Sequence, residues 1–289
     1  MITRISTNNH FHSIHNQEGQ RYECYDFLLP MFDVHCHILP NLDDGPKSWE
    51  IALEMCRMAR QDGIEHIVAT PHADDTYAYD RENALDRLNE LRQRTEEKLE
   101  FSLGCDFHLS YDNLSDALAH PHRYTIAEKQ YLLVELSNYS VPPETANCLF
   151  RLRAIGIQPI LTHPERHPIL QRHPQQVVEW VKEECIVQVT ASALTGEWGE
   201  VARRSALWLL ENQAVHVIAT DAHDDRRRKP LLSQAREFVS KRFGAEVATA
   251  LVEDNPKAIV KGEKLPFFPP PAKGRRKLLA NLRRAVSGS

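Results

Sequence analysis

The sequence predicts an α/β fold, a distorted (β/α)7 barrel whose functional site lies at the C-terminal ends of its strands. Short β-rich runs alternate with segments of helical periodicity, which indicates parallel strands joined by helices. Run after run begins apolar and ends in His, Asp or Glu. An open parallel sheet would concentrate its site near one switch point, whereas nearly every run contributes here, so we favour the barrel.

Seven runs are expected as strands, at 31–37, 65–72, 100–108, 130–137, 157–163, 186–194 and 215–223. Segments with helical periodicity lie between most of them, at 48–61, 80–99, 175–184, 201–212 and 231–243. In the first of these, Ile51, Met55 and Met58 fall on one stripe, as expected for a helix that packs on a sheet. The repeated order predicts one catalytic domain over 31–265.

The two ends of the chain differ from this domain. Residues 1–30 are polar without periodicity, so we expect a poorly ordered extension, and the sequence leaves open whether Met31 is the true start. Residues 266–289 open with PFFPPP and then carry six basic and no acidic residues. Over 277–286 this tail could form a short basic helix that contacts an anionic membrane surface. The net charge of the whole chain is −5, so residues 1–265 carry about −11. This acidic body argues against a specific nucleic-acid partner.

Composition and cysteine usage favour a cytoplasmic protein. The sequence has no apolar run of about 18 residues and no secretory pattern at its N-terminus. Its six cysteines are scattered with no CxxC pair, as is typical of a reduced protein with buried thiols.

The first strand ends in Asp33-Val34-His35-Cys36-His37. Side chains alternate across a strand, so His35 and His37 share a face and can bind one metal ion, while Cys36 points away. Asp33 lies on the same face one step deeper, where it could accept a hydrogen bond from a ligating imidazole. An HxH pair by itself is a weak signal in a chain with 15 histidines.

Other strand ends supply the same kinds of ligand. They are His72, Asp106, Glu135, His163, Asp221 and His223, with Asp44 in the loop after the first strand. Each alone is explained as a satisfied core or capping residue. Together they need compensating positive charge, and only Arg166 is nearby in sequence, so metal cations are the simplest explanation. Imidazole and carboxylate ligands without cysteine fit Mn²⁺, Fe or Zn²⁺, and several carboxylates imply more than one ion.

These residues carry a resemblance to the PHP (polymerase and histidinol phosphatase) superfamily, a distorted TIM-like barrel fold. Within it, the chain resembles the bacterial manganese-dependent protein tyrosine phosphatases of the capsular and exopolysaccharide type over roughly 31–260. The signatures are DVHCH (33–37), DDGPKS (43–48), TPH (70–72), VEL (134–136), THPER (162–166), DAH (221–223) and DNPKAIV (254–260).

The resemblance implies three Mn²⁺ ions. One would be held by His35, His37 and Asp221 with a bridging Asp106, a second by that bridge with Glu135 and His163, and a third by Asp44, His72 and His223. The family pattern commonly has Glu at the bridge, and Asp106 is shorter by one methylene. The resemblance also implies that Arg166 binds the phosphate and stabilises transition-state charge, and that metal-bound hydroxide hydrolyses a phosphate monoester. The sequence does not assign the general acid; His108, His167 and Asp224 are candidates by position only.

The implied substrate is phosphotyrosine in a protein, such as the tail of a bacterial tyrosine kinase that controls exopolysaccharide or capsule synthesis, and a homo-oligomer stays open. A histidinol-phosphate-type phosphatase, a PHP phosphodiesterase and a non-catalytic module of the same fold remain alternatives. An amidohydrolase would be expected to show a bridging lysine where Glu135 stands. A thiol-based phosphatase is excluded, because no cysteine is followed six positions later by arginine.

Overall fold

The computed structural model describes residues 12–15, 21–24 and 30–272. Within the N-terminal extension it places two short antiparallel strands, β1 (His12–His15) and β2 (Arg21–Cys24). The other residues of this extension and the basic segment 273–289, with the helix expected over 277–286, lie outside the described residues.

The described body is a mixed α/β fold with parallel strands. The strands are β3 (Met31–Cys36), β4 (Ile64–Ala69), β5 (His72–Ala73), β6 (Glu100–Leu103), β7 (Asp106–His108), β8 (Tyr131–Glu135), β9 (Gln158–Thr162), β10 (Ile186–Thr190) and β11 (Val217–Ala219). They form one sheet in the order β11-β10-β9-β8-β7-β5 and a second in the order β3-β4-β6, and every pairing within both sheets is parallel.

The two sheets are connected at both sides. The end of β3 meets the segment after β11 through the His37 N–H to Ala222 carbonyl and Asp221 N–H to His35 carbonyl hydrogen bonds, both 2.8 Å. On the other side, the chain passes from β4 directly into β5 and from β6 directly into β7. All the strand ends that carry candidate ligands therefore face the same end of the fold.

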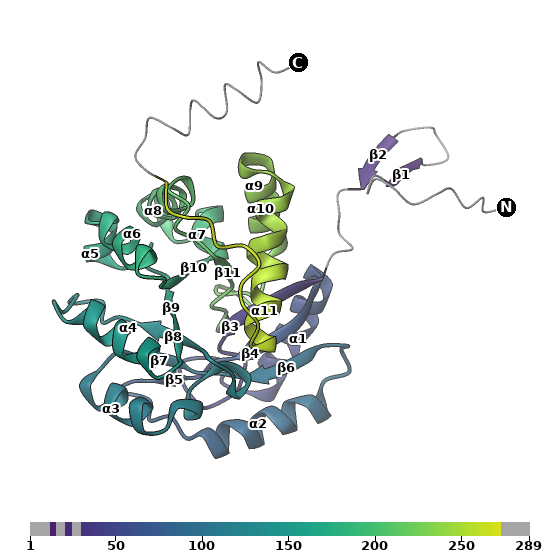
Figure 1. The fold of residues 1–289 in the computed structure, drawn as a ribbon. Coiled ribbons are helices and arrows are strands. Elements are labelled where there is room, and N and C mark those ends of the chain that lie inside the picture. The colour runs from purple at the N-terminus through teal and green to yellow at the C-terminus, as the bar shows by residue number, and fades with distance from the viewer. Residues whose placement is uncertain (1–11, 16–20, 25–29, 273–289) are drawn as a thin grey trace.

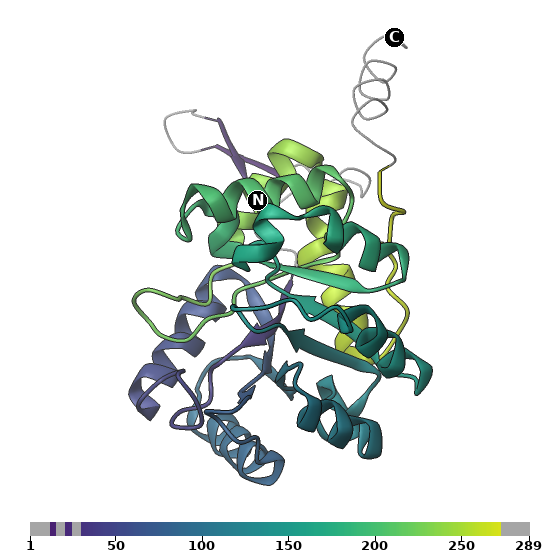
Figure 2. The same cartoon turned by 90° about the vertical axis from the view of Figure 1, so that its left-hand side faces the viewer.

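Helices surround the strands, as Figure 1 and the turned view in Figure 2 show. They are α1 (Trp49–Asp62), α2 (Arg81–Arg94), α3 (Tyr111–Ala119), α4 (Thr145–Ala154), α5 (Pro168–Arg172), α6 (Gln175–Lys182), α7 (Ala191–Thr195), α8 (Gly199–Glu211), α9 (Ser233–Phe243), α10 (Ala245–Thr249) and α11 (Asn255–Lys261). Three short turns of 3₁₀ or π type are η1 (Pro121–Arg123), η2 (Ile126–Glu128) and η3 (Ala250–Asp254).

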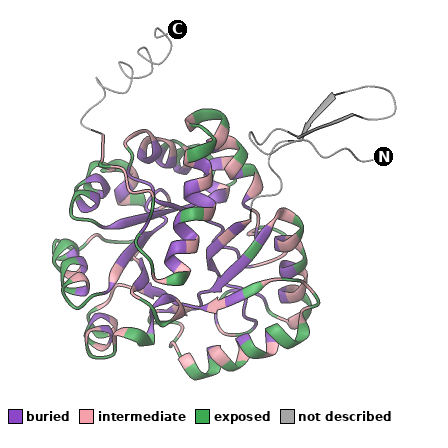
Figure 3. Cartoon of the chain, turned by 45° about the vertical axis from the view of Figure 1, so that its right-hand side comes forward, coloured by how far each residue is buried: buried purple, intermediate pink, exposed green. Residues whose placement is uncertain are grey.

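Local sequence signals explain where the first two of these helices begin. Ser48 caps α1 by accepting a hydrogen bond from the Ile51 N–H, and Asp80 caps α2 by accepting from the N–H groups of Glu82 and Asn83. One face of α2 carries Leu88 and Leu91, both fully buried, while its charged face is exposed. Figure 3 shows the same division across the molecule, with buried strands and exposed outer helix faces.

The strand predictions are confirmed in position but wrong in several details, and the run 215–223 is a strand only over Val217–Ala219. The run 65–72 is two strands, because β4 ends at Ala69 and Pro71, which has no N–H to donate, separates it from β5. The run 100–108 is likewise divided between β6 and β7 at Gly104 and Cys105. The run 186–194 ends as a strand at Thr190, and its last residues Ala-Ser-Ala-Leu begin helix α7, in keeping with the helix preference of Ala and Leu.

None of the helices within residues 30–272 is long and apolar enough to cross a bilayer. The five cysteines of this part of the chain are free thiols, and all except Cys148 are buried, as expected.

Candidate metal centre

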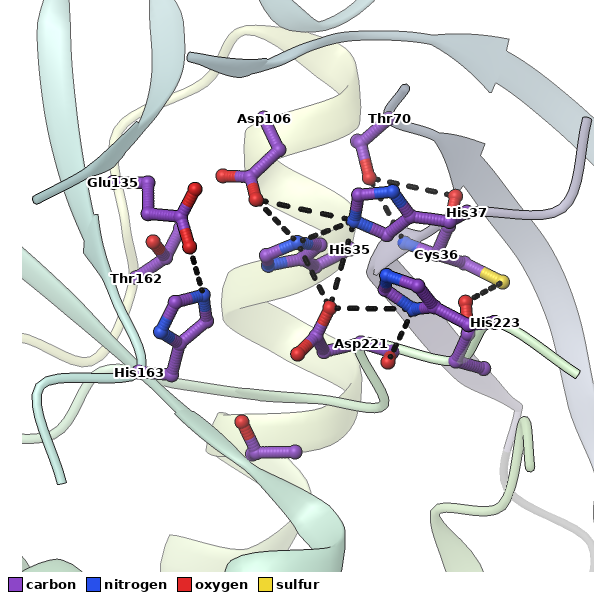
Figure 4. Close-up of polar contacts among 12 residues, drawn as sticks. His35, Cys36, His37, Thr70, Asp106, Glu135, Thr162, His163, Asp221 and His223 are labelled. Carbon is purple, nitrogen blue, oxygen red and sulfur yellow. Dashed lines mark hydrogen bonds and ion pairs between the residues drawn. The ribbon is translucent and has the colours of Figure 1, made fainter. Parts of the chain in front are cut away.

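The structure brings the nine candidate ligands together at one end of the fold, where seven lie at or after the C-terminal ends of strands and His72 and Asp106 are the first residues of β5 and β7. His35, His72, Asp106 and Glu135 lie on or at the ends of strands, and the others lie in the segments that directly follow strands. Figure 4 shows His35 between the carboxylates of Asp106 and Asp221, with Glu135 and His163 facing each other beside them. Residues that are up to 188 positions apart, His35 and His223, therefore share one cluster.

Three overlapping groups have ligand atoms within 4.8 Å of one another. They are His37, Asp44, His72 and His223; His35, His37 and Asp106; and His72, Asp106 and Glu135. Asp106 belongs to two groups, as the bridging ligand expected from the resemblance would. His37 and His72 also belong to two groups each, whereas the resemblance assigned each of them to a single ion.

The two remaining ligands lie at the edges of these groups. Nε2 of His163 is 3.6 Å from a carboxylate oxygen of Glu135. Oδ1 of Asp221 is 3.4 Å from Nε2 of His35 and 3.5 Å from Nε2 of His37. Both belong to the cluster by distance.

His163 and Asp221 also adopt an unusual backbone conformation. Their φ angles are +32° and +52°, in the left-handed region that residues with a Cβ rarely occupy. Such conformations cost on the order of 1–3 kcal/mol and persist where the surrounding structure requires them, most often at functional sites. The fold therefore holds both side chains at the cluster in a strained backbone conformation.

Two polar groups orient the imidazoles of the HxH pair. Nδ1 of His35 is 3.1 Å from Oε1 of Gln188, and Nδ1 of His37 is 2.7 Å from Oδ2 of Asp43. With each Nδ1–H donated outward, both Nε2 lone pairs point into the cluster, and the two Nε2 atoms are 3.2 Å apart. Two lone pairs this close repel unless a cation or a proton lies between them.

The loop motif DDG positions Asp43 for this task. Asp43 also accepts hydrogen bonds from the N–H groups of Gly45 and His72. A Cβ at position 45 would lie 2.5 Å from the His37 carbonyl oxygen, so only glycine lets the loop approach the strand this closely. The adjacent Asp44 then reaches His223, with 3.1 Å between Oδ1 and Nε2.

The charges of the cluster disfavour a fully ionised state without cations. Burial together with the charge of Asp106 raises the pKa of Glu135 to about 8. Burial opposes protonation of His35, but the nearby carboxylates of Asp106 and Asp221 outweigh it and raise the pKa of His35 to about 9. The carboxylates thus require positive charge beside them.

Several buried atoms of the cluster have no hydrogen-bond partner among the described residues. They are both carboxylate oxygens of Asp106 and Nδ1 of His72. Buried polar atoms are normally satisfied, and atoms left over in a convergent set of imidazoles and carboxylates match the ligands of hard and borderline divalent metals. The residues present therefore fit a metal centre.

Asp33 does not have the contact that the strand pattern predicted. Its buried carboxylate accepts hydrogen bonds from the N–H and hydroxyl groups of Thr220 and from the His35 N–H, rather than from an imidazole of the cluster. Burial raises its pKa to about 6. The reason is its depth in β3, where it faces the end of β11; Asp43 and Gln188 take the role expected of Asp33.

Two arginines approach the cluster. Arg166, expected from the sequence, and Arg228, which was not, both donate to Oδ2 of Asp221, the latter at 2.6 Å. Arg228 also lies 3.8 Å from Asp44. The sequence offers Arg226, Arg227 and Arg228 in a row, with no pattern to show that only the last would turn inward.

Two of the three candidate general acids have other roles. The His167 imidazole caps α5 and contacts the Ser137 carbonyl oxygen at 2.7 Å. Asp224 accepts hydrogen bonds from the N–H groups of Arg226 and Arg227 and so holds the loop that carries Arg228.

A parallel α/β fold with a histidine and carboxylate cluster at its strand ends defines the class of metal-dependent hydrolases. Comparison with known proteins narrows this class. Residues 31–261 match the family described as "Capsular polysaccharide synthesis, CpsB/CapC", and the chain belongs to this family.

Relatives with assigned names support the match. A putative tyrosine-protein phosphatase CapC of Staphylococcus aureus is 33% identical over 208 residues, which is 71% of this chain and 81% of the relative. The tyrosine-protein phosphatase YwqE of Bacillus subtilis is 30% identical over 253 residues, which is 86% of this chain and 98% of the relative.

Solved structures agree. A crystal structure from work on YwqE of Bacillus subtilis and CpsB of Streptococcus pneumoniae, described as metal-dependent tyrosine phosphatases, superposes with a TM-score of 0.77 at 28% identity and covers 85% of this chain and 100% of that one. The phosphotriesterase homology protein of Escherichia coli, with a TM-score of 0.54, 9% identity and coverage of 80% and 98%, shares the fold alone.

Proposed function

We propose that this chain is a metal-dependent protein tyrosine phosphatase that hydrolyses phosphotyrosine in a protein substrate. The observation that carries the proposal is the pairing of a nine-residue ligand cluster with two inward-pointing arginines at one mouth of the fold. The named relatives are phosphatases of this specificity. Phosphate esters are dianionic, so both halves of the site, cations and guanidinium groups, suit them.

Three Mn²⁺ ions are the proposed cofactor, with Fe or Zn²⁺ as substitutes. Asp106 would be the bridging ligand. The other ligands would be His35, His37, Asp44, His72, Glu135, His163, Asp221 and His223. When bound, such ions supply Lewis acidity and activate water for attack on phosphorus.

The chain's own residues have separable tasks in this reaction. Asp43 and Gln188 orient imidazoles, and Asp33 fixes the end of β3 against Thr220. Arg166 and Arg228 would bind the phosphoryl oxygens and offset the charge that develops on them in the transition state. The phenol of tyrosine has a pKa of about 10, lower than that of an alkyl alcohol, so this leaving group needs less protonation by a general acid.

Further proposals concern the whole chain. The two connected sheets would close as a distorted (β/α)7 barrel over 31–265, with 1–30 as an extension and 266–289 as a tail. The protein would act in the cytoplasm on the tail of a tyrosine kinase of capsule or exopolysaccharide synthesis, with the basic tail at the membrane surface. A homo-oligomer is compatible with the proposal.

The test uses the full chain, stripped with a chelator and reloaded with Mn²⁺, Fe²⁺ or Zn²⁺. Phosphate release is measured from a phosphotyrosyl peptide, the matching phosphoseryl peptide, histidinol phosphate and a phosphodiester. We expect the Mn²⁺ form to prefer the phosphotyrosyl peptide by at least about tenfold in kcat/KM. A preference for histidinol phosphate or the diester would refute the proposal, and so would equal activity in the stripped protein.

A further inference from the structure

The ring of Trp198 lies against both arginines of the site. The guanidinium carbon of Arg166 is 4.0 Å from the ring centroid, and that of Arg228 is 5.6 Å from it. Both distances are within the roughly 6 Å range of a cation–π interaction. Trp198 is therefore the one described aromatic residue that contacts both guanidinium groups of the site.

The backbone holds this ring firmly. Trp198 lies between α7 and α8, and its indole Nε1–H donates to Oγ of Ser192 at 2.9 Å. The following Gly199 has a φ of +82° and donates its N–H to the Gly196 carbonyl oxygen at 2.9 Å, which closes a tight turn around the tryptophan. A residue with a Cβ would strain this turn.

The ring is also in an unusual position for a large apolar side chain. The Trp198 residue is 40% exposed, although Arg166 and Arg228, which contact its ring, reach into a buried cluster. Its exposure shows that it does not serve the hydrophobic core. Its contacts are instead with the two guanidinium groups that reach the cluster.

The charges of the two arginines explain why an aromatic ring beside them matters. Arg166 and Arg228 are like charges that converge on one oxygen, Oδ2 of Asp221. A bound phosphoryl group would compete with Asp221 for the same N–H groups. With that contact weakened, the π face of Trp198 would be what keeps the two guanidinium groups together.

We propose that Trp198 is a positioning residue, which holds the guanidinium groups of Arg166 and Arg228 side by side so that they receive the phosphoryl group together. The inference rests on the proposed phosphatase function. It concerns phosphate recognition and is independent of which alcohol is esterified.

The experiment compares Trp198→Leu, which keeps apolar volume without a π face, with Trp198→Phe, which keeps the face. The matched control is Trp49→Leu, because Trp49 at the start of α1 has Arg94 of α2 over its ring at 4.7 Å, and Arg94 is not an arginine of the site. Each full-length, Mn²⁺-loaded variant is titrated with inorganic phosphate by calorimetry. KM and kcat are measured with p-nitrophenyl phosphate, and folding is followed by thermal unfolding.

We expect Trp198→Leu to raise the phosphate Kd and the KM by about tenfold, with a smaller fall in kcat. Trp198→Phe should stay within about threefold of the parent protein, and Trp49→Leu should leave Kd and KM unchanged. An unchanged Kd in Trp198→Leu, equal defects in the Phe and Leu variants, or a parent protein that binds no phosphate would each overturn the inference. Because Kd is measured without turnover, a failure to cleave phosphotyrosyl peptide would refute the proposed function and leave this result standing.

Discussion

Oδ2 of Asp43 accepts a hydrogen bond from Nδ1 of His37 at 2.7 Å, and this contact aims Nε2 of the imidazole into the cluster. Hydrogen bonds of this kind orient metal-binding histidines and raise their basicity. The Asp43 side chain is 1% exposed and lies in the loop that Gly45 allows to approach β3.

We therefore predict that Asp43→Asn weakens metal binding by about 10- to 100-fold with little change in fold. Metal content after gel filtration and competition with a chelator measures the effect. Asp80→Asn is the control, because Asn replaces Asp at a helix cap without loss. Equal metal affinity in the parent protein and Asp43→Asn would show that Asp43 has only a structural role.

Asp106 joins two of the ligand groups, at the position where the resemblance implied a bridging acid that is commonly Glu. Asp106→Asn should remove the bridge, reduce the metal stoichiometry and lower kcat by at least about 100-fold, because an amide is a poor bridging ligand. Asp106→Glu should keep the charge and retain most of the metal.

Native mass spectrometry of the loaded protein gives the stoichiometry directly. If Asp106→Asn binds as many ions as the parent protein, the bridging role is wrong.

Arg228 should be as important as Arg166 although only Arg166 was expected from the sequence. We predict that Arg228→Ala lowers kcat/KM for the phosphotyrosyl peptide by about 10²-fold, because a donor to the developing charge is lost. Arg226→Ala is the matched control, since the Arg226 side chain is 88% exposed on the same loop. Similar kinetics in the two variants would contradict an inward role for Arg228.

His216 makes stability depend on pH at a place away from the metal centre. Burial lowers its pKa to about 3, its Nδ1 accepts the Val187 N–H at 3.1 Å, and its ring stacks on Phe268. Because the folded pKa is below the ordinary value of 6.5, the unfolded chain binds the extra proton first. The contribution is therefore complete above about pH 6.5 and is lost as the pH falls toward 3.

At about pH 5 this group should cost the folded state about 2 kcal/mol relative to neutral pH. His216→Asn, whose carbonyl oxygen can accept the Val187 N–H, should be less stable at neutral pH but should show a flatter pH dependence. Urea unfolding at several pH values measures both, with the exposed His122→Asn as control. Parallel pH profiles for the parent protein and His216→Asn would exclude the effect.

Much of the candidate site was predictable because strand periodicity is local. Alternation places His35 and His37 on one face of their strand, independently of the rest of the chain. The parallel arrangement brings the ligand-type residues near the strand ends to one end of the fold. Side-chain partners were less predictable. Asp33 was expected to orient an imidazole, yet Thr220, 187 positions away, takes up its carboxylate.

In the fold, too, local features were predictable and long-range pairings were not. Helix caps and apolar stripes are local, and they placed α1 and α2 within a few residues of the expected bounds, except that 95–99 lie beyond α2. Pro71 marks where the run 65–72 is interrupted, but the assignment of the two halves of 65–72 and of 100–108 to different sheets depends on which neighbours each half pairs with.

The sequence by itself determined the kinds of ligand, their order along the chain and the face of each strand that carries them, since these depend on residue type and on a period of two. Only the tertiary structure decided that Asp43 and Gln188 aim the imidazoles, that Arg228 rather than Arg226 or Arg227 turns inward, and that Trp198 lies against both arginines. The contacts of Gln188 with His35 and of Trp198 with the two arginines join segments far apart in the chain. Asp43 and Arg228 lie close in sequence to His37 and Asp221, but their side chains reach these partners only because of how their loops fold against the strand ends.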